Sequence, residues 1–340
     1  MANGLADLWQ LAGARIPAQD AVDPYWRAKP FRQGHVSGFR VQDSVCPAFR
    51  KSRHKRPQIG QLRDLVMSTV DAACGTLETV VAVAHDAGRA ILDVYQRDFG
   101  FENKADGSPL TEADCASNRL IVQRLAELIP AVPVLSEETQ VVPFAQRRLW
   151  RRFWLVDPLD GTKEFVKRNG EFTVNIALID ECHPLLGVVH VPVSGVTYLA
   201  CRGVGAFLQE ADGRRREIRA RIYRGGRATV VASRSHAGDK LGEFLARLQA
   251  KEGAYETTSL GSSLKICLVA EGRADIYPRL GPTSEWDTAA AQCVLEVAGG
   301  RLTDVQGKML AYNKESVLNS WFLASGAGNY DWTALVDSHG

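Results

Sequence analysis

An apolar stretch runs straight into two aspartates in residues 154–162 (WLVDPLDGT). Asp157 and Asp160 bracket a proline-containing turn, so both carboxylates and the Leu159 carbonyl can converge on one point, in the all-oxygen environment that Mg²⁺ prefers. Two carboxylates about 4 Å apart repel by roughly 4 kcal/mol at an effective dielectric constant of 20, and a bound cation turns that repulsion into attraction. The structural alternative, in which Asp157 starts a turn and Asp160 caps a helix near Gly161, stays open on this segment alone.

Other carboxylates stand where a predicted strand ends or a predicted helix begins. Glu137 and Glu138 follow the short apolar strand 133–135. Such strand ends often carry sites in layers of strands and helices, and exposed glutamates are the alternative. Asp287 begins a predicted helix, where it can cap the helix and also act as a ligand beside positive backbone dipoles. For Asp114, the capping-box pattern TEAD already explains an acidic residue.

The order and spacing of these residues resemble a known family. The signature of the inositol monophosphatase superfamily of metal-dependent phosphatases is matched by Glu137-Glu138, residues 157–162 and Trp286-Asp287. Within that superfamily, three segments are similar to the CysQ-type 3'(2'),5'-bisphosphate nucleotidases: residues 104–114 (KADGSPLTEAD), 160–175 (DGTKEFVKRNGEFTVN) and 260–266 (LGSSLKI). The resemblance covers about residues 77–330 and continues through residues 277–287, where Ser284 stands in a place that we expect to hold a larger residue.

The resemblance implies a site with two or three Mg²⁺ ions. Two ions are bridged by Asp157, and their implied protein ligands are four carboxylates and one backbone carbonyl: Glu137, Asp157, Asp160, Asp287 and Leu159. Glu137 and the Leu159 carbonyl belong to the first ion, whereas Asp160 and Asp287 belong to the second. A third, weaker ion is implied beside Glu137, and the resemblance also implies inhibition by Li⁺. Two metals about 3.5 to 4 Å apart would acidify a bound water and stabilise the leaving oxygen.

The resemblance also implies catalytic and substrate-binding roles. Asp114 and Thr162 resemble the family pair that orients and deprotonates the attacking water, with Glu137 as the third catalytic residue and Glu138 as a supporting one. The candidate substrate contacts combine backbone N–H groups, hydroxyls, cations and one carboxylate: Gly161, Thr162, Ser262, Ser263, Lys265, Arg279 and Asp287. A second phosphate, remote from the metals, needs hydroxyl and cationic donors of this kind. Lys265 as a solvated helix residue is the alternative.

Periodicity predicts a layered fold of helices and sheets. Helical spacing of apolar residues spans residues 77–97, and a second helix is expected to start at Thr111 after a polar loop, residues 102–109. Strands are predicted at residues 152–156, 173–179, 186–193 and 196–200, and strands alternate with helices at residues 228–232, 239–249, 255–260, 263–270, 274–277, 288–298 and 321–324. The resemblance implies an α-β-α-β-α sugar-phosphatase fold, α+β to α/β in class, with helices layered on mixed sheets.

Three regions are expected along the chain. Residues 1–70 are predicted to be a basic, poorly ordered extension, because residues 1–66 hold 11 lysines and arginines against 5 acidic residues, with little periodicity. Met67 is a candidate for the true start. Residues 71–220 would form an α+β domain with most metal ligands, and residues 221–340 an α/β domain that supplies Asp287 and substrate contacts. The boundary is placed in the basic, glycine-containing stretch 213–226.

Composition places the chain among globular proteins. Of its 340 residues, 45% are apolar and 24% are charged. There is no apolar run of the roughly 18 residues that span a membrane and no signal pattern at the N-terminus, so a cytoplasmic location is expected, with peripheral association at the inner face of the cell membrane as the alternative. Seven scattered cysteines without a C-x-x-C pair argue against a disulfide framework or zinc site and favour buried free thiols.

Three functions remain in play. The first is a nucleotidase that hydrolyses the 3'-phosphate of 3'-phosphoadenosine 5'-phosphate to AMP, with 3'-phosphoadenylyl sulfate as a second substrate and a link to sulfur assimilation. The second is an inositol monophosphatase or related sugar phosphatase. The third is a catalytically silent phosphate- or nucleic-acid-binding protein, which is disfavoured because such a protein would be expected to lose a metal-site residue. The expected partner is a small nucleotide rather than nucleic acid, and the protein is expected to be a monomer or homodimer.

Overall fold

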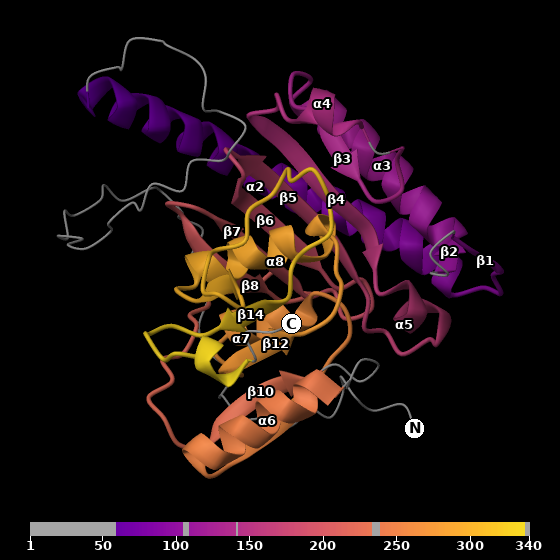
Figure 1. Cartoon of the computed structure of the whole chain (residues 1–340). Coiled ribbons are helices and arrows are strands. Elements are labelled where there is room, and N and C mark those ends of the chain that lie inside the picture. Colours follow the sequence, from indigo (N-terminus) through magenta and orange to yellow (C-terminus); the bar gives the residue numbers. More distant parts are fainter. Residues whose placement is uncertain (1–58, 105–108, 141, 233–238, 337–340) are drawn as a thin grey trace, which may run out of the picture. The chain divides into compact units, whose positions relative to one another are not determined.

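The computed structural model describes residues 59–104, 109–140, 142–232 and 239–336. All of these residues lie in one compact unit of the chain (Figure 1). Among them, no helix combines the length and the apolar character needed to cross a membrane. The predicted N-terminal extension covers residues 1–70. Of these, residues 1–58 lie outside the part of the chain that the structure describes.

The larger sheet has seven strands in the order β3-β4-β5-β6-β7-β8-β9. The β3–β4 pair is parallel and the other neighbours are antiparallel. From β4 to β9, the order of the strands in space follows their order in the chain, as is common for consecutive strands. The strands are β3 (Val134–Ser136), β4 (Arg152–Asp160), β5 (Thr173–Asp180), β6 (His183–His190), β7 (Thr197–Cys201), β8 (Gly205–Gln209) and β9 (Arg215–Glu217).

The second sheet has five strands in the order β11-β10-β12-β14-β13. Strand β10 pairs in parallel with β11 and β12, whereas β14 is antiparallel to both of its neighbours, so this sheet is mixed. A separate hairpin joins β1 (Phe101–Asn103) to β2 (Pro109–Thr111). The strands of the second sheet are β10 (Ala228–Ala232), β11 (Tyr255–Ser259), β12 (Ile276–Arg279), β13 (Arg301–Asp304) and β14 (Phe322–Ser325).

Helices separate and cover the two sheets. Helices α2 and α3 pack together and α2 lies on β5, β6 and β7, whereas α8 contacts β4 to β8 and α7, and α7 in turn contacts β10, β12 and β14. On the second sheet, Phe244 of α6 packs with Val230 and Ile276. The helices are α2 (Ile59–Tyr95), α3 (Glu112–Leu128), α4 (Phe144–Arg147), α5 (Thr162–Val166), α6 (Asp239–Glu252), α7 (Leu264–Ala270), α8 (Glu285–Val297) and the 3-10 turn η2 (Thr333–Leu335). The predicted layered α+β class is therefore confirmed.

The core explains why these segments take their conformations. In α2, the buried positions include Val80, Ala84, Ala87 and Ile91, which recur at three- and four-residue spacing and face the first sheet. The predicted helix over 77–97 is present, but α2 begins earlier, at Ile59, so its first turns fall within the stretch expected to be an extension. Of the described cysteines, four are buried, as expected for free thiols, and Cys115 is exposed.

One glycine allows α8 to lie directly on the first sheet. A Cβ atom at Gly187 in β6 would come within 2.4 Å of the Ala290 carbonyl oxygen and 2.7 Å of the Cys293 Cβ. Real Cβ atoms do not approach this closely, so the absence of a side chain sets the depth at which α8 packs. The position of Asp287, in the first turn of α8, depends on this contact.

Several short strands differ from the sequence expectation. The predicted loop 102–109 includes parts of β1 and β2, and the prediction missed β8, β9 and β13. Strand β9 lies inside the basic stretch 213–226 and is exposed throughout, so it has no alternating apolar pattern that a sequence could reveal. Along the chain, β9 is the last strand of the first sheet and β10 is the first strand of the second sheet. The division into domains 71–220 and 221–340 stays a prediction.

Candidate active site

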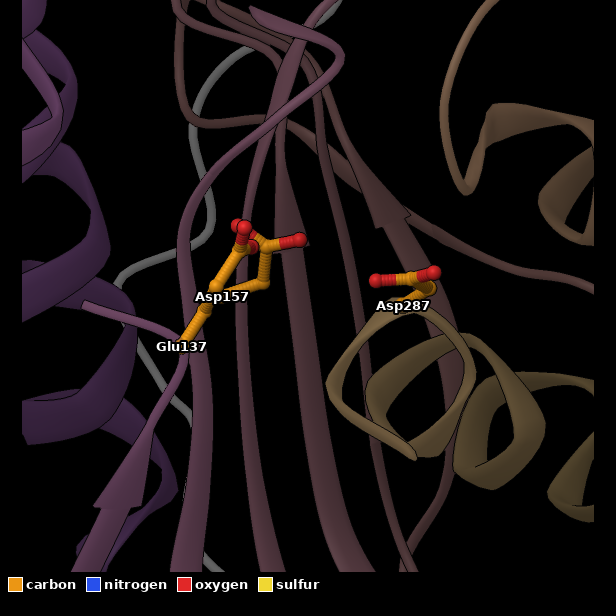
Figure 2. A group of neighbouring side chains, drawn as sticks. All are labelled: Glu137, Asp157 and Asp287. Atoms are coloured by element: carbon orange, nitrogen blue, oxygen red, sulfur yellow. The ribbon is translucent and has the colours of Figure 1, made fainter. Parts of the chain in front are cut away.

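Three carboxylates from distant parts of the chain converge on one space. Glu137 follows β3, Asp157 lies in β4, and Asp287 lies in the first turn of α8. One carboxylate oxygen of each residue lies within 4.8 Å of the others. In Figure 2, the Glu137 and Asp157 side chains lie side by side, and Asp287 faces them from the end of its helix. The sequence pattern anticipated each residue, and the structure brings the three together.

The end of β4 is irregular, and this irregularity shapes the site. Asp157 pairs with Asn175 and Asp160 pairs with Thr173, so β4 has one more residue than β5 between these pairs. Such a bulge bends the strand and redirects its side chains. The Leu159 N–H donates to Asp157 Oδ1 at 3.1 Å, which holds the turn.

Asp160 does not cap a helix, so the structural alternative for this residue is wrong. The N-cap of α5 is Gly161, in a left-handed conformation with φ 93°, and no side chain caps the helix. Asp160 Oδ2 instead accepts the Ser263 N–H at 2.6 Å and an Asn175 amide hydrogen at 3.2 Å. Asp160 lies outside the three-carboxylate group but joins the end of β4 to the loop before α7.

The buried carboxylates raise one another's pKa values. Burial, followed by the charges of Glu137, Asp160 and Asp287, raises the pKa of Asp157 well above its ordinary value. Burial and the Asp160 charge raise the pKa of Asp287 to about 8. Burial raises the pKa of Asp160 to about 6, although the Lys265 ammonium opposes this rise. Clustered, desolvated carboxylates of this kind fit a hard divalent cation, whose charge would offset their repulsion.

Asp114 and Thr162 are close enough to interact. The Thr162 hydroxyl lies 3.4 Å from Asp114 Oδ1 and 3.3 Å from the Leu159 carbonyl oxygen, so its one proton can be donated to either acceptor. Asp114 Oδ2 accepts the Thr111 N–H at 2.7 Å, so the predicted capping box is confirmed. Burial raises the pKa of Asp114. The cap occupies one oxygen of Asp114, and the other faces Thr162.

Asp287 also belongs to a capping box. Its Oδ2 accepts the Ser284 N–H at 2.8 Å, and Ser284 is the N-cap of α8. This hydrogen bond confirms the predicted cap. Asp287 also belongs to the group of three carboxylates with Glu137 and Asp157. Both capping boxes therefore use an aspartate at the third helical position, and both direct it toward the end of β4.

Sequence reasoning assigned no role to Lys104, which reaches into the site. Its Nζ donates to Glu137 Oε1 at 2.7 Å and also pairs with Glu138 Oε1. Burial opposes the lysine charge, but the two ion pairs outweigh burial and raise the pKa of Lys104. Lys104 stands in the segment similar to the nucleotidases, but its partners lie more than thirty residues away, so no local pattern reveals the pairing.

A pocket beside the carboxylates collects most of the predicted substrate contacts. Lys265 is buried, its Nζ donates to the carbonyls of Ser262 at 2.7 Å and Leu260 at 3.3 Å, and the ammonium lies 5.6 Å from the Tyr277 ring centroid. The solvated-residue alternative for Lys265 is therefore wrong. The pocket is lined by residues that include Asp160, Gly161, Ser262, Ser263, Lys265, Arg279 and Asp287.

Arg279 stands at this pocket with an unsatisfied donor. Its Nη2 donates to the Pro282 carbonyl at 2.9 Å. Its Nε is buried and has no hydrogen-bond partner among the residues that the structure describes. A buried guanidinium N–H without a partner suits an anionic ligand, because leaving it unpaired is costly.

A second pocket adjoins the first and contains the carboxylate group. It is lined by residues that include Glu137, Asp157, Leu159, Thr162 and Trp286. The two pockets share a wall that includes Asp160, Gly161 and Asp287. An acidic compartment and a compartment with cationic side chains thus stand next to each other.

Comparison with known proteins agrees with this architecture. The chain belongs to the inositol monophosphatase family, whose family model matches residues 75–332. Proteins of this family are metal-dependent phosphatases. A 3'(2'),5'-bisphosphate nucleotidase CysQ of Escherichia coli K12 is 51% identical over 252 residues, covering 73% of this chain and 99% of that protein. The 3'(2'),5'-bisphosphate nucleotidase CysQ of Salmonella typhimurium is 50% identical over 249 residues, covering 72% of this chain and 98% of that protein.

A solved structure is also similar to this chain. The crystal structure of CysQ from Bacteroides thetaiotaomicron, a bacterial member of the inositol monophosphatase family, is 40% identical and superposes with a TM-score of 0.66. The match covers 77% of this chain and 98% of that protein.

Proposed function

We propose that this protein is a Mg²⁺-dependent 3'(2'),5'-bisphosphate nucleotidase. It would hydrolyse the 3'-phosphate of 3'-phosphoadenosine 5'-phosphate to give AMP and phosphate, with 3'-phosphoadenylyl sulfate as a second substrate. Such an activity links the protein to sulfur assimilation. The similar proteins of E. coli and Salmonella are 3'(2'),5'-bisphosphate nucleotidases, which supports this proposal.

The observation that carries this proposal is the pair of adjoining pockets. The acidic pocket suits the metals and the phosphate that is cleaved, and the pocket with Lys265 and Arg279 suits a second phosphate. A substrate with two separate phosphates would use both compartments at once. An inositol monophosphate has only one phosphate and would leave the pocket with Lys265 and Arg279 without an anionic group.

The metal ligands are proposed from the donors at the end of β4. Glu137, Asp157 and the Leu159 carbonyl would hold one Mg²⁺, and Asp157, Asp160 and Asp287 a second, with a third beside Glu137. When bound, the ions supply an acidified water and electrostatic stabilisation of the leaving oxygen. The all-oxygen donor set, and the repulsion that raises the pKa values of these carboxylates, support this assignment.

The protein's own residues would position the water and the phosphate. The Thr162 hydroxyl, which is hydrogen-bonded to Asp114, would orient the attacking water and pass its proton to the Asp114 carboxylate. The raised pKa of Asp114 makes it a better proton acceptor than an ordinary aspartate. Backbone N–H groups of Gly161 and Thr162 would hold phosphate oxygens. The water oxygen would bond to phosphorus as the bond to the ribose 3'-oxygen breaks, and the departing 3'-oxygen would take up a proton from solvent to give the hydroxyl of AMP.

A phosphate-release assay tests the proposal. The purified protein would be given 3'-phosphoadenosine 5'-phosphate or inositol 1-phosphate, each with Mg²⁺ and with excess chelator. We expect a higher kcat/KM for the bisphosphate and no turnover in chelator. A preference for inositol 1-phosphate would favour the inositol monophosphatase, and binding of the bisphosphate without turnover would favour a silent binding protein.

A further inference from the structure

A buried glutamate connects the first sheet to the loop that carries the predicted substrate contacts. Glu171 is 2% exposed, and its Oε2 accepts the Gly261 N–H at 2.7 Å. Two residues further along this loop, the Ser263 N–H donates to Asp160 and the Ser263 hydroxyl donates to Asn175 Oδ1 at 2.9 Å. The loop 260–263 is therefore held at several points by residues that flank or belong to β4 and β5.

The backbone at Glu171 fits between two glycines. A Cβ atom at Gly261 would come within 2.5 Å of the Glu171 carbonyl oxygen and 2.9 Å of the Glu164 Cγ. A Cβ atom at Gly161 would come within 3.2 Å of the same carbonyl oxygen. One of these glycines stands in the turn after Asp160 and the other in the substrate loop, so Glu171 sets the distance between these two segments.

The conformation of the loop requires support from its surroundings. Ser262 has φ 46°, a left-handed conformation that is unfavourable for a residue with a side chain. Such conformations persist when neighbouring contacts hold them, and the contacts at Gly261 and Ser263 flank this residue. Lys265 Nζ donates to the Ser262 carbonyl, so the position of the ammonium depends on the same loop conformation.

We propose that Glu171 is a positioning residue for substrate binding. By accepting the Gly261 N–H, its carboxylate holds the loop 260–263 in the conformation that presents Ser262 and Lys265 to the second phosphate. This inference rests on the proposed nucleotidase function. Glu171 lines neither of the two pockets and would act through the loop rather than by touching substrate.

Two substitutions separate this role from a structural one. Glu171→Gln keeps a side-chain oxygen that can accept the Gly261 N–H, whereas Glu171→Leu removes the acceptor at similar volume. With 3'-phosphoadenosine 5'-phosphate and saturating Mg²⁺, we expect Glu171→Leu to raise KM about tenfold or more and to leave kcat within about twofold. Glu171→Gln should stay within about threefold of the wild type in both constants, because the neutral hydrogen bond is weaker but present.

A second measurement is independent of activity. Hydrogen–deuterium exchange should become faster in peptides that contain Gly261 in Glu171→Leu, and it should stay close to the wild type in Glu171→Gln. Gly261→Ala disturbs the junction from its other side and should reproduce the rise in KM. If Glu171→Leu does not fold, Gly261→Ala and Glu171→Gln carry the comparison.

The outcomes distinguish this inference from the proposed function. If the wild type releases no phosphate from the bisphosphate, the proposed function fails, and the exchange experiment alone tests the hold of Glu171 on the loop. If the wild type is active but Glu171→Leu keeps its KM and its slow exchange, the inference is overturned. A fall in kcat at unchanged KM would also overturn it, because Glu171 would then serve the metal site or the general fold.

Discussion

Replacing Lys265 by methionine tests how the second phosphate is bound. Lys265 is 8% exposed, so Lys265→Ala would leave a cavity in addition to removing the charge. Methionine keeps the unbranched stem beside Tyr277 and removes only the ammonium. The substitution therefore isolates the electrostatic contribution of this side chain.

The size of the expected effect follows from the energy of one charge-assisted hydrogen bond. A charge-assisted hydrogen bond contributes roughly 1.5 to 3 kcal/mol, which corresponds to a loss of about 10- to 150-fold in kcat/KM if the ammonium contacts the second phosphate. The same ammonium holds the carbonyls of Ser262 and Leu260, so a part of the loss can come from the loop. That part would act on every substrate that uses the loop, whereas the direct contact acts only on a substrate with the second phosphate.

The assay compares two substrates that differ in one phosphate. At saturating Mg²⁺, kcat/KM would be measured for 3'-phosphoadenosine 5'-phosphate and for adenosine 3'-phosphate. We expect Lys265→Met to reduce kcat/KM about 10- to 150-fold for the first and to change it little for the second. The matched control is Lys240→Met, which removes a half-exposed lysine of α6, away from both pockets, and should change neither.

Equal losses on the two substrates would refute this reasoning. Lys265 would then serve the loop or the metal site rather than the second phosphate. An unchanged kcat/KM on both substrates would mean that the ammonium does not contact substrate, and the pocket beside the carboxylates would have to bind the second phosphate through Arg279 and the hydroxyls.

Four further predictions follow from the site and the fold. Asp160→Asn keeps an acceptor for the Ser263 N–H but loses a ligand charge, so kcat should fall by about tenfold or more at saturating Mg²⁺ with little change in melting temperature; an unchanged kcat would remove Asp160 from the metal site. Phosphate release should require Mg²⁺, stop in excess chelator and be inhibited by Li⁺, and full turnover in chelator would contradict the metal mechanism. Without metal, the pKa of Asp287 is raised to about 8 in the folded state, whereas an aspartate in the unfolded chain has a pKa of about 4. Between these two pH values the folded state binds more protons than the unfolded chain, so raising the pH destabilises it. The melting temperature in chelator should therefore fall as pH rises from about 5.5 to 8.5. Mg²⁺ should stabilise the protein more at the higher pH, and a melting temperature in chelator that rises with pH would contradict the raised pKa. Gly187→Ala should lower the free energy of unfolding by about 1 to 3 kcal/mol in chemical denaturation, because its Cβ meets the Ala290 carbonyl, whereas Gly242→Ala in α6 meets nothing and should not destabilise; equal results would mean that α8 can shift away from β6.

Much of the site is encoded in short segments and could be predicted from the sequence. Asp157 and Asp160 lie three residues apart at the end of an apolar strand, and Asp114 lies three residues after Thr111 at a helix start. The strand β4 and the capping box of α3 follow from patterns that span only a few residues, because strand alternation and helix capping are local properties of the chain. The same local patterns placed β10 and α6 close to their observed bounds.

Tertiary structure alone decided which of these segments meet. Asp287 joins Glu137 and Asp157 because α8 packs closely on β6 at Gly187, a contact between segments about a hundred residues apart. The sequence assigned no role to Lys104 or Glu171, and it marked Lys265 only as a candidate substrate contact. Their partners in the structure are Glu137, Gly261 and the Ser262 carbonyl. Burial, pKa and the pairing of distant residues depend on how the layers pack, and no periodicity within one segment contains that information.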